Sequence, residues 1–354
     1  MTTTTTRTEA PAPGHSRLTG GQLPRWAVGT VGAGAIALAV LLNMTTGLAG
    51  WFGTTLVGAL LFIAAQSAWS FAVEGKRHAV DRLATTLVYS TFVIALVPLI
   101  SVLWTVIVNG LRVMSWDFLT LSMRNVSPRS TGGGAGHAIV GTIEQVLIAA
   151  AFAVPVGILA AIFLVEYGRG RLARAISFFV DVMTGIPSIV AGLFIFTAFV
   201  LGLGLERSGF AAALALAILM LPVIIRTTEE MLRIVPNDLR EAAYALGVPK
   251  WRTVIKVVLP TALAGIVTGA MLAVARVAGE TAPLLLTTFL TQSYNNNPFS
   301  GPQAALPTFV WDQITSGTPA SVDRAWAGAL VLITLVMIVY IAAKLLAARF
   351  APKG

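Results

Sequence analysis

The sequence contains no cysteine, few charged residues and few histidines. Of its 354 residues, 11% are charged and 56% are hydrophobic, and the mean hydropathy is +0.83. Soluble domains usually contain about 25% charged residues, so this composition indicates a chain with a lipid-facing surface. The lack of cysteine excludes disulfides, thiolate zinc sites and cysteine nucleophiles. No metal cluster is predicted from the histidines, which lie far apart in segments expected to be tail or loop: His15, His78 and His137.

The sequence also lacks an ATP-binding loop. The pattern Gly-x-x-x-x-Gly-Lys-Ser/Thr, which cradles nucleotide phosphates, does not occur, and no Lys follows the Gly-rich stretch 132–136. The net charge of +9 does not indicate a nucleic-acid-binding protein, because Lys and Arg lie between apolar runs and not on one polar, aromatic-rich face. We therefore expect no enzyme activity, no bound cofactor and no nucleic-acid partner.

Long apolar runs are the main feature that is present. Stretches of roughly the length that crosses about 30 Å of hydrocarbon occur eight times. They predict an all-α, polytopic membrane helix bundle of about eight transmembrane helices, at residues 26–42, 50–73, 83–108, 138–165, 175–203, 210–225, 259–288 and 325–348. The preceding segment, residues 1–24, is polar and of low complexity, so we expect a disordered cytoplasmic tail.

Positive charge predicts the orientation. With the N-terminus in the cytoplasm, the cytoplasmic segments contain 18 Lys and Arg residues and the outside segments contain five. Short cytoplasmic loops retain positive charge, so both termini are expected in the cytoplasm. Two long outside segments, 109–137 and 291–324, are rich in turn-forming residues. They either dock an external partner or only connect helices.

The cytoplasmic segment 226–259 has the most informative spacing. It contains Pro236-Asn237-Asp238, Glu241-Ala242-Ala243, Gly247-Val248-Pro249 and finally Leu259-Pro260. Asn237 or Asp238 is expected to cap a short helix that Gly247 ends and Pro249 prevents from continuing. A basic stretch is expected to lead from there to the next span. The spacing resembles the EAA signature of ABC importer permeases, with Val257 where the family has Ile.

The resemblance implies that this short helix inserts into a cleft of a separate ATP-hydrolysing subunit and transmits its closure to the membrane helices. Small alanines would permit close approach, Gly247 a sharp exit, and Glu241 would act as a charged anchor or as a partner of the helix dipole. The alternative is an amphipathic surface loop without a partner. The coupling residues implied by the signature are Glu241, Ala242, Ala243, Gly247, Leu259 and Pro260.

An Arg and a Glu lie inside the seventh expected span. Arg276 and Glu280 are four residues apart, so on a continuous helix they share one face and neutralise each other. A charge at the bilayer centre costs about 2.5 to 3.5 kcal/mol on insertion scales, so such residues usually mark a transport pathway. Either the pair only locks the helix to its neighbours, or Arg276 offers its guanidinium to an anion. Gly279 and Pro283 predict a bend here.

Two segments resemble one family of permeases more narrowly. The run from Arg276 to Pro283, with its Gly-Glu-Thr core, is similar to phosphate permeases of the PstA and PstC type, and the Ala-Pro-Leu-Leu continuation favours PstA. Residues 181–192 resemble the fifth-span segment of that family, where Gly185 and Pro187 interrupt the helix. The candidate pathway residues are Arg276, Glu280, Thr281, Ser188 and Asp181, although Asp181 suits an interfacial role equally well.

The resemblance implies a type I ABC permease core of six helices within 83–348, best defined over 138–348, with two additional helices within 25–73. It further implies import of inorganic phosphate through the bacterial cytoplasmic membrane. The implied partners are membrane lipid, a second permease of the PstC type, an ATPase dimer of the PstB type that binds the ATP, and an extracytoplasmic binding protein of the PstS type. Two alternatives remain: a sulfate or molybdate permease, and a proton-coupled secondary transporter, for which no inverted repeat is visible.

Overall fold

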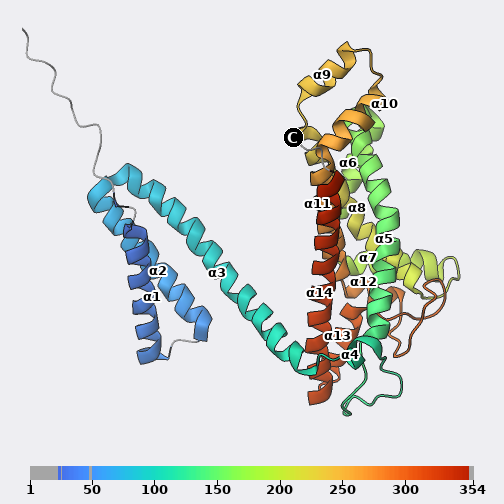
Figure 1. The fold of residues 1–354 in the computed structure, drawn as a ribbon, viewed down its shortest axis with the longest axis horizontal. Helices are drawn as coiled ribbons and strands as arrows, with labels where there is room; N and C mark the ends of the chain where they lie inside the picture. The colour runs from blue at the N-terminus through green and yellow to red at the C-terminus, as the bar shows by residue number, and fades with distance from the viewer. Residues whose placement is uncertain (1–22, 25, 48–49, 351–354) are drawn as a thin grey trace, which may run out of the picture. The chain divides into compact units, whose positions relative to one another are not determined.

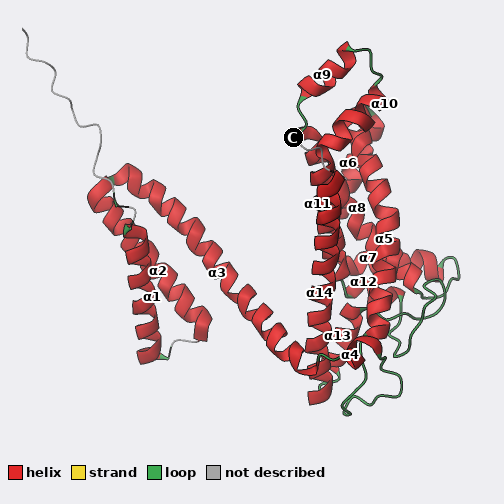
Figure 2. Cartoon of the chain, viewed as in Figure 1, coloured by secondary structure: helices red, strands yellow, loops and turns green. Residues whose placement is uncertain are grey.

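The computed structural model describes residues 23–24, 26–47 and 50–350, so nearly all of the expected tail, 1–24, lies outside the described residues. Within these ranges the regular structure is helical and contains no strand (Figure 2). The chain divides into two units that meet between Trp104 and Thr105. This division falls inside the long helix α3 (Lys76–Val113).

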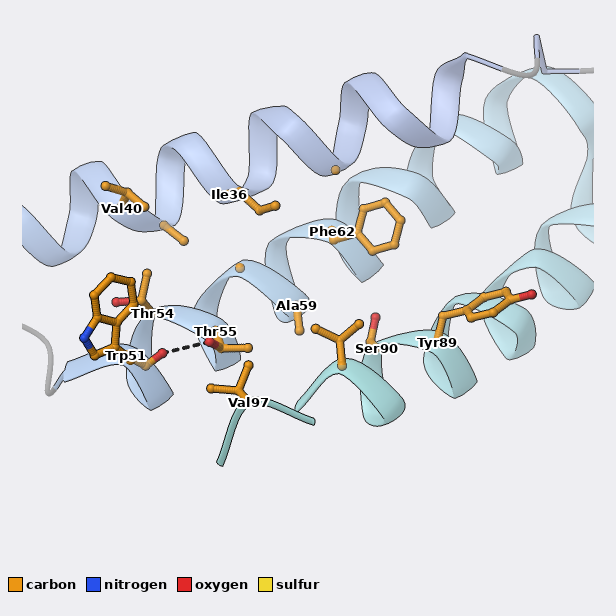
Figure 3. A pocket seen from close by; sticks show the side chains of 14 residues that line it. Ile36, Val40, Trp51, Thr54, Thr55, Ala59, Phe62, Tyr89, Ser90 and Val97 are labelled. Carbon is orange, nitrogen blue, oxygen red and sulfur yellow. Dashed lines mark hydrogen bonds between the residues drawn. The ribbon is translucent and has the colours of Figure 1, made fainter. Parts of the chain in front are cut away.

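The first unit contains the two additional helices, α1 (Ala27–Thr46) and α2 (Gly50–Glu74), which pack along each other. At the end of α2, the Glu74 carboxylate accepts hydrogen bonds from the Leu23 backbone N–H at 2.8 Å and the Ser70 hydroxyl at 2.7 Å. The same carboxylate pairs with Arg82 of α3 at 2.6 Å. An apolar cavity of about 440 Å³ lies between α1, α2 and the first part of α3 (Figure 3).

Helices long enough to cross a membrane account for most of the described residues. Seven qualify by length and composition, and the helix pair Arg171–Thr184 and Ser188–Leu201 makes an eighth if it is one span bent by 111°. The prediction of about eight transmembrane helices is confirmed. The bent pair consists of α6 (Arg171–Thr184), α7 (Ser188–Ile195) and the π-helix η2 (Phe196–Leu201). It breaks at residues 185–187, as the glycine and proline there predicted.

The second unit is a bundle around α8 (Gly209–Ile234), which packs against α5 (Gly136–Ile162), α6, α7 and α11 (Leu259–Ala278). Glycines let the backbones approach closely, as is common between membrane helices. A Cβ on Gly157 of α5 would lie 2.7 Å from Ile224 Cγ2, and one on Gly269 of α11 would lie 2.4 Å from Thr227 Oγ1. The last helix, α14 (Pro319–Phe350), packs against α11 and α13 (Leu306–Thr315).

The two ends of this unit differ (Figure 1). One end holds α9 (Asn237–Ala245), α10 (Lys250–Thr253) and the last turns of α14; the opposite end holds α4 (Trp116–Thr120) and α13. The two expected outside loops are therefore partly helical, because local signals such as the Ser115 side chain, which accepts from the Phe118 N–H at 3.1 Å, start new helices. His137, expected in a loop, lies buried in the first turn of α5, beside the rings of Tyr294 and Phe309.

Candidate functional site

The predicted bend in the seventh span is confirmed, and it is a complete break. The helix α11 ends at Ala278, and the Glu280 N–H closes the last turn on the Val277 carbonyl at 3.1 Å. The next helix, α12 (Ala282–Thr287), begins with Pro283 in its first turn. Proline has no N–H with which to bond the Gly279 carbonyl, which favours a break at this point. Glu280 therefore lies beyond the helix, and the prediction that Arg276 and Glu280 share a helical face is wrong.

Arg276 stands on the last turn of α11 with an exposed side chain. Within the described part of the chain, its guanidinium has no ion pair and no side-chain hydrogen bond, whereas Glu280 and Thr281 are half-buried beside it. Guanidinium N–H groups form a planar fork of donors that matches an oxyanion and stays charged at all physiological pH values. The break thus presents an unpaired, permanent positive charge.

A second break lies close to the first. The helix α7 packs against α12, and Gly192 makes this contact possible, because a Cβ at that position would lie 2.5 Å from the Pro283 Cα. Ser188 is the first residue of α7 and is half-buried; Thr281 immediately precedes α12. The helices that follow the two breaks are therefore in contact, and both breaks leave backbone groups outside regular helix.

Asp181 has a positive partner of its own. It lies on α6 and forms an ion pair with Arg226 of α8, which also donates to Glu229 Oε2 at 2.6 Å and to the Ser177 carbonyl at 3.3 Å. No contact joins Asp181 to Arg276 within the described residues. The sequence placed Arg226 in a cytoplasmic loop, but α8 continues to Ile234. The Arg226-x-x-Glu229 spacing, typical of a helical ion pair, is the signal in the sequence that could have indicated this continuation.

The helix α9 carries the EAA residues and differs from its prediction at one end. Pro236 occupies the N-cap and no side chain caps the helix, so the expected cap by Asn237 or Asp238 is wrong. At the other end Gly247 has φ 73°, and the Val248 N–H returns to the Ala243 carbonyl at 3.1 Å. The predicted glycine stop is confirmed, because glycine adopts this left-handed conformation without steric cost.

The basic stretch expected after α9 is present, with Lys250, Arg252 and Lys256, and it is helical. Pro249 precedes α10, which continues through the π-helix η3 (Val254–Val258) into α11. Leu259 and Pro260 form the first turn of α11. The non-helical part of the predicted coupling loop 226–259 is thus confined to short stretches on either side of α9.

Most of α9 faces outward. Ala243 is buried, whereas Glu241, Ala242 and Tyr244 are exposed, and Leu246 at the end of the helix is 84% exposed. These exposed residues form the outer face of α9.

One arginine fixes α9 to the bundle. Arg240 donates to the carbonyls of Val235 at 2.6 Å and Leu232 at 2.9 Å, both at the end of α8. It also pairs at 2.9 Å with Glu166 of the π-helix η1 (Phe163–Tyr167), which extends α5. The two side chains are 12% and 5% exposed, so the pair is largely shielded from water. These bonds therefore fix the position of α9 relative to α8 and α5.

The opposite end of the unit is closed by a polar network. Gln303, in the segment before α13, is buried; it donates to Glu144 Oε2 at 2.5 Å and accepts from Gln145 Nε2 at 3.1 Å. Tyr294 in the same segment donates to the Thr120 carbonyl, and burial raises the pKa of its phenol, which keeps it a neutral donor. The sequence indicated none of these contacts. Within the described ranges no group of three or more His, Cys, Asp or Glu is placed to hold a metal ion.

Comparisons with known proteins agree with these features. Residues 153–352 match the family described as binding-protein-dependent transport system inner membrane component. The chain is 46% identical over 272 residues to phosphate transport system permease protein PstA 1 of Mycobacterium tuberculosis (strain CDC 1551 / Oshkosh), which covers 77% of this chain and 90% of that protein. It is 39% identical over 277 residues to the PstA protein of Yersinia pestis, with 78% and 92% covered. A solved inward-facing structure of the MetNI methionine ABC transporter shares the fold, with a TM-score of 0.51 at 22% identity over 68% of this chain and all of that one.

Proposed function

Because this chain belongs to the family of binding-protein-dependent transport system inner membrane components, as a PstA-type ABC permease, we propose that it lines half of the pathway of an ATP-driven importer of inorganic phosphate. A second, homologous permease of the PstC type completes the pathway. The observation that carries the proposal is the exposed Arg276, unpaired within the described residues, at the end of α11. The printed names of the relatives support phosphate as the anion.

Arg276 offers charge-assisted hydrogen bonds to phosphate at the break between α11 and α12. Thr281 and Ser188, at the starts of the two helices that pack together, supply hydroxyl groups to the same region. Glu280 beside them repels an anion, which keeps phosphate from binding so tightly that it fails to leave, as transport requires. Asp181 belongs to a different part of the mechanism, through Arg226.

Energy reaches this pathway from outside the chain. The exposed face of α9, with Glu241, Ala242 and Leu246, docks in a cleft of a separate PstB-type ATPase dimer. The bonds of Arg240 transmit a movement of α9 to α8 and α5. Support for a cytoplasmic C-terminus comes from the last turns of α14, which lie at the α9 end of the unit (Figure 1). The bias of positive charge supports a cytoplasmic N-terminus as well. A PstS-type binding protein delivers phosphate to the opposite end.

Uptake of radiolabelled phosphate by the complete importer tests the proposal. Arg276→Gln removes about two charge-assisted hydrogen bonds, and a loss of about 3 kcal/mol lowers uptake by roughly 100-fold. The matched control is Arg171→Gln, an exposed arginine at the start of α6, which retains normal uptake. Normal uptake in Arg276→Gln contradicts the assigned role. Equal inhibition of wild-type uptake by unlabelled sulfate or molybdate would show that the anion is wrongly assigned.

A further inference from the structure

Arg226 connects the coupling end of α8 to the broken span, and we propose that it is the positioning residue through which movement of α9 reaches α6 and α7. The inference rests on the proposed function, since it concerns how the energy of a separate ATPase is used. Arg226 does not touch the substrate in this proposal. It acts by fixing where α6 lies relative to α8.

The contacts of Arg226 run in two directions. Within α8, Nη1 donates to Glu229 Oε2 at 2.6 Å, and the Glu229 side chain is only 5% exposed. This buried carboxylate orients the guanidinium. Across to α6, Nη2 donates to the Ser177 carbonyl at 3.3 Å, to the Ser177 hydroxyl at 3.2 Å and to Asp181. Arg226 therefore bonds Glu229 within α8 and, across to α6, bonds two residues that are one helical turn apart.

The helix α8 is in turn attached to α9. Arg240 of α9 bonds the Leu232 and Val235 carbonyls, which lie at the end of α8, one to three turns beyond Arg226. Apolar side chains continue the link, because Val180 of α6 belongs to the same buried cluster as Ile225 and Leu232. A displacement of α9 by the ATPase therefore moves the part of α8 that carries Arg226.

On the far side, α6 leads to the pathway. It turns by 111° into α7 at residues 185–187, and α7 rests on α12 where Gly192 meets Pro283. The helix α12 begins just after the break that carries Arg276. A shift of α6 relative to α8 consequently moves Ser188 and the wall beside Arg276. The chain of contacts is continuous from α9 to the proposed phosphate site.

The Asp181 contact is suited to being made and broken. The Asp181 side chain is 66% exposed, and exposed ion pairs contribute little to folding stability. Glu229, in contrast, is buried and keeps Arg226 neutralised whether or not Asp181 is bound. The Arg226–Asp181 bond to α6 can therefore break and re-form, while the Arg226–Glu229 bond within α8 stays in place.

The assembled importer in proteoliposomes provides the test, with phosphate moved per ATP hydrolysed as the measurement. Asp181→Asn removes the negative charge on α6 and leaves the Arg226–Glu229 pair intact. We expect ATP hydrolysis to continue and phosphate per ATP to fall at least fivefold, with no change in the melting temperature of the complex or in the KM for phosphate. Arg226→Lys, which keeps the charge but loses the planar fork, is expected to lower the same ratio. In the double variant, phosphate per ATP should be no lower than in the more affected single variant, because both changes weaken the same Arg226–Asp181 contact.

The control is Arg233→Gln, an exposed arginine on the same helix without a side-chain bond to any described residue, for which the ratio stays at the wild-type value. An unchanged ratio in Asp181→Asn overturns the inference. An altered KM with an unchanged ratio also overturns it, since that result places Asp181 in the pathway itself. If the wild-type importer moves a different anion, the proposed substrate is wrong, but the ratio measured with that anion still tests the role of Arg226.

Discussion

Two regions of the bundle use arginine in opposite ways. At the coupling end, Arg240 is 12% exposed and its donors are occupied by two carbonyls and a buried carboxylate. At the break after α11, Arg276 is exposed and has no side-chain partner among the described residues. A saturated guanidinium holds two pieces of protein together, whereas an unsaturated one is available to a ligand. The same residue type therefore serves as a structural joint in one place and is proposed as a binding group in the other.

Replacing the joint is expected to have the largest effect on stability. Arg240→Ala leaves Glu166 buried without a counter-charge, and breaking such a pair costs about 3 to 5 kcal/mol. We expect a strong decrease in the free energy of unfolding of the protein in detergent. Arg233→Ala, an exposed arginine nearby, is the control and leaves it unchanged. Equal stability of the two variants would remove the distinction between the two regions.

A substitution at the contact between α7 and α12 is expected to lower the stability of the protein less than Arg240→Ala does. In Gly192→Ala the new Cβ would lie 2.5 Å from the Pro283 Cα, so backbone must shift, at a cost of about 1 to 3 kcal/mol. Gly185→Ala is the control, since its Cβ meets only the Val182 carbonyl at 3.6 Å. Uptake should fall in the first variant and persist in the second. The opposite order would show that the two breaks act independently.

The smallest effect on stability is expected at Arg276 itself. Arg276→Ala removes an exposed side chain with no bonded partner within the described ranges, so the free energy of unfolding should change by less than about 0.5 kcal/mol. Thermal unfolding of the variant beside Arg240→Ala makes the comparison direct. A loss as large as that of Arg240→Ala would mean that Arg276 is also a structural joint.

The sequence predicted features that depend on local backbone chemistry. Gly247 was expected to end α9 and does so with a positive φ, and Gly279 with Pro283 was expected to bend the seventh span. Failures arose where a charge was taken as the end of an apolar run. Arg226 and Glu229 lie inside α8, because the helix stays packed beyond the apolar run, with Thr228, Glu229 and Leu232 all buried.

Contacts between distant parts of the chain left no local signal. Gln303 bonds Gln145, 158 residues away, and neither glutamine lies in a pattern that suggests a partner. Arg324 was assigned to an outside loop, yet it lies fully buried in α14, where it donates to Gln313 at 2.8 Å and to the Ser130 carbonyl at 2.7 Å. Such partners are set by how the helices assemble, which spacing along one chain does not encode.

The π-helical turns η1 and η3 have a consequence for how the length of this chain can vary. Each is a wide turn that accommodates one more residue than an α-helical turn, and they lie where α5 ends and where α11 begins. Deleting one residue there converts the wide turn into an ordinary one without rotating the long helix beside it. We expect a one-residue deletion at residues 163–167 or 254–258 to be absorbed locally, while the faces of α5 and α11 that meet α8 keep their register.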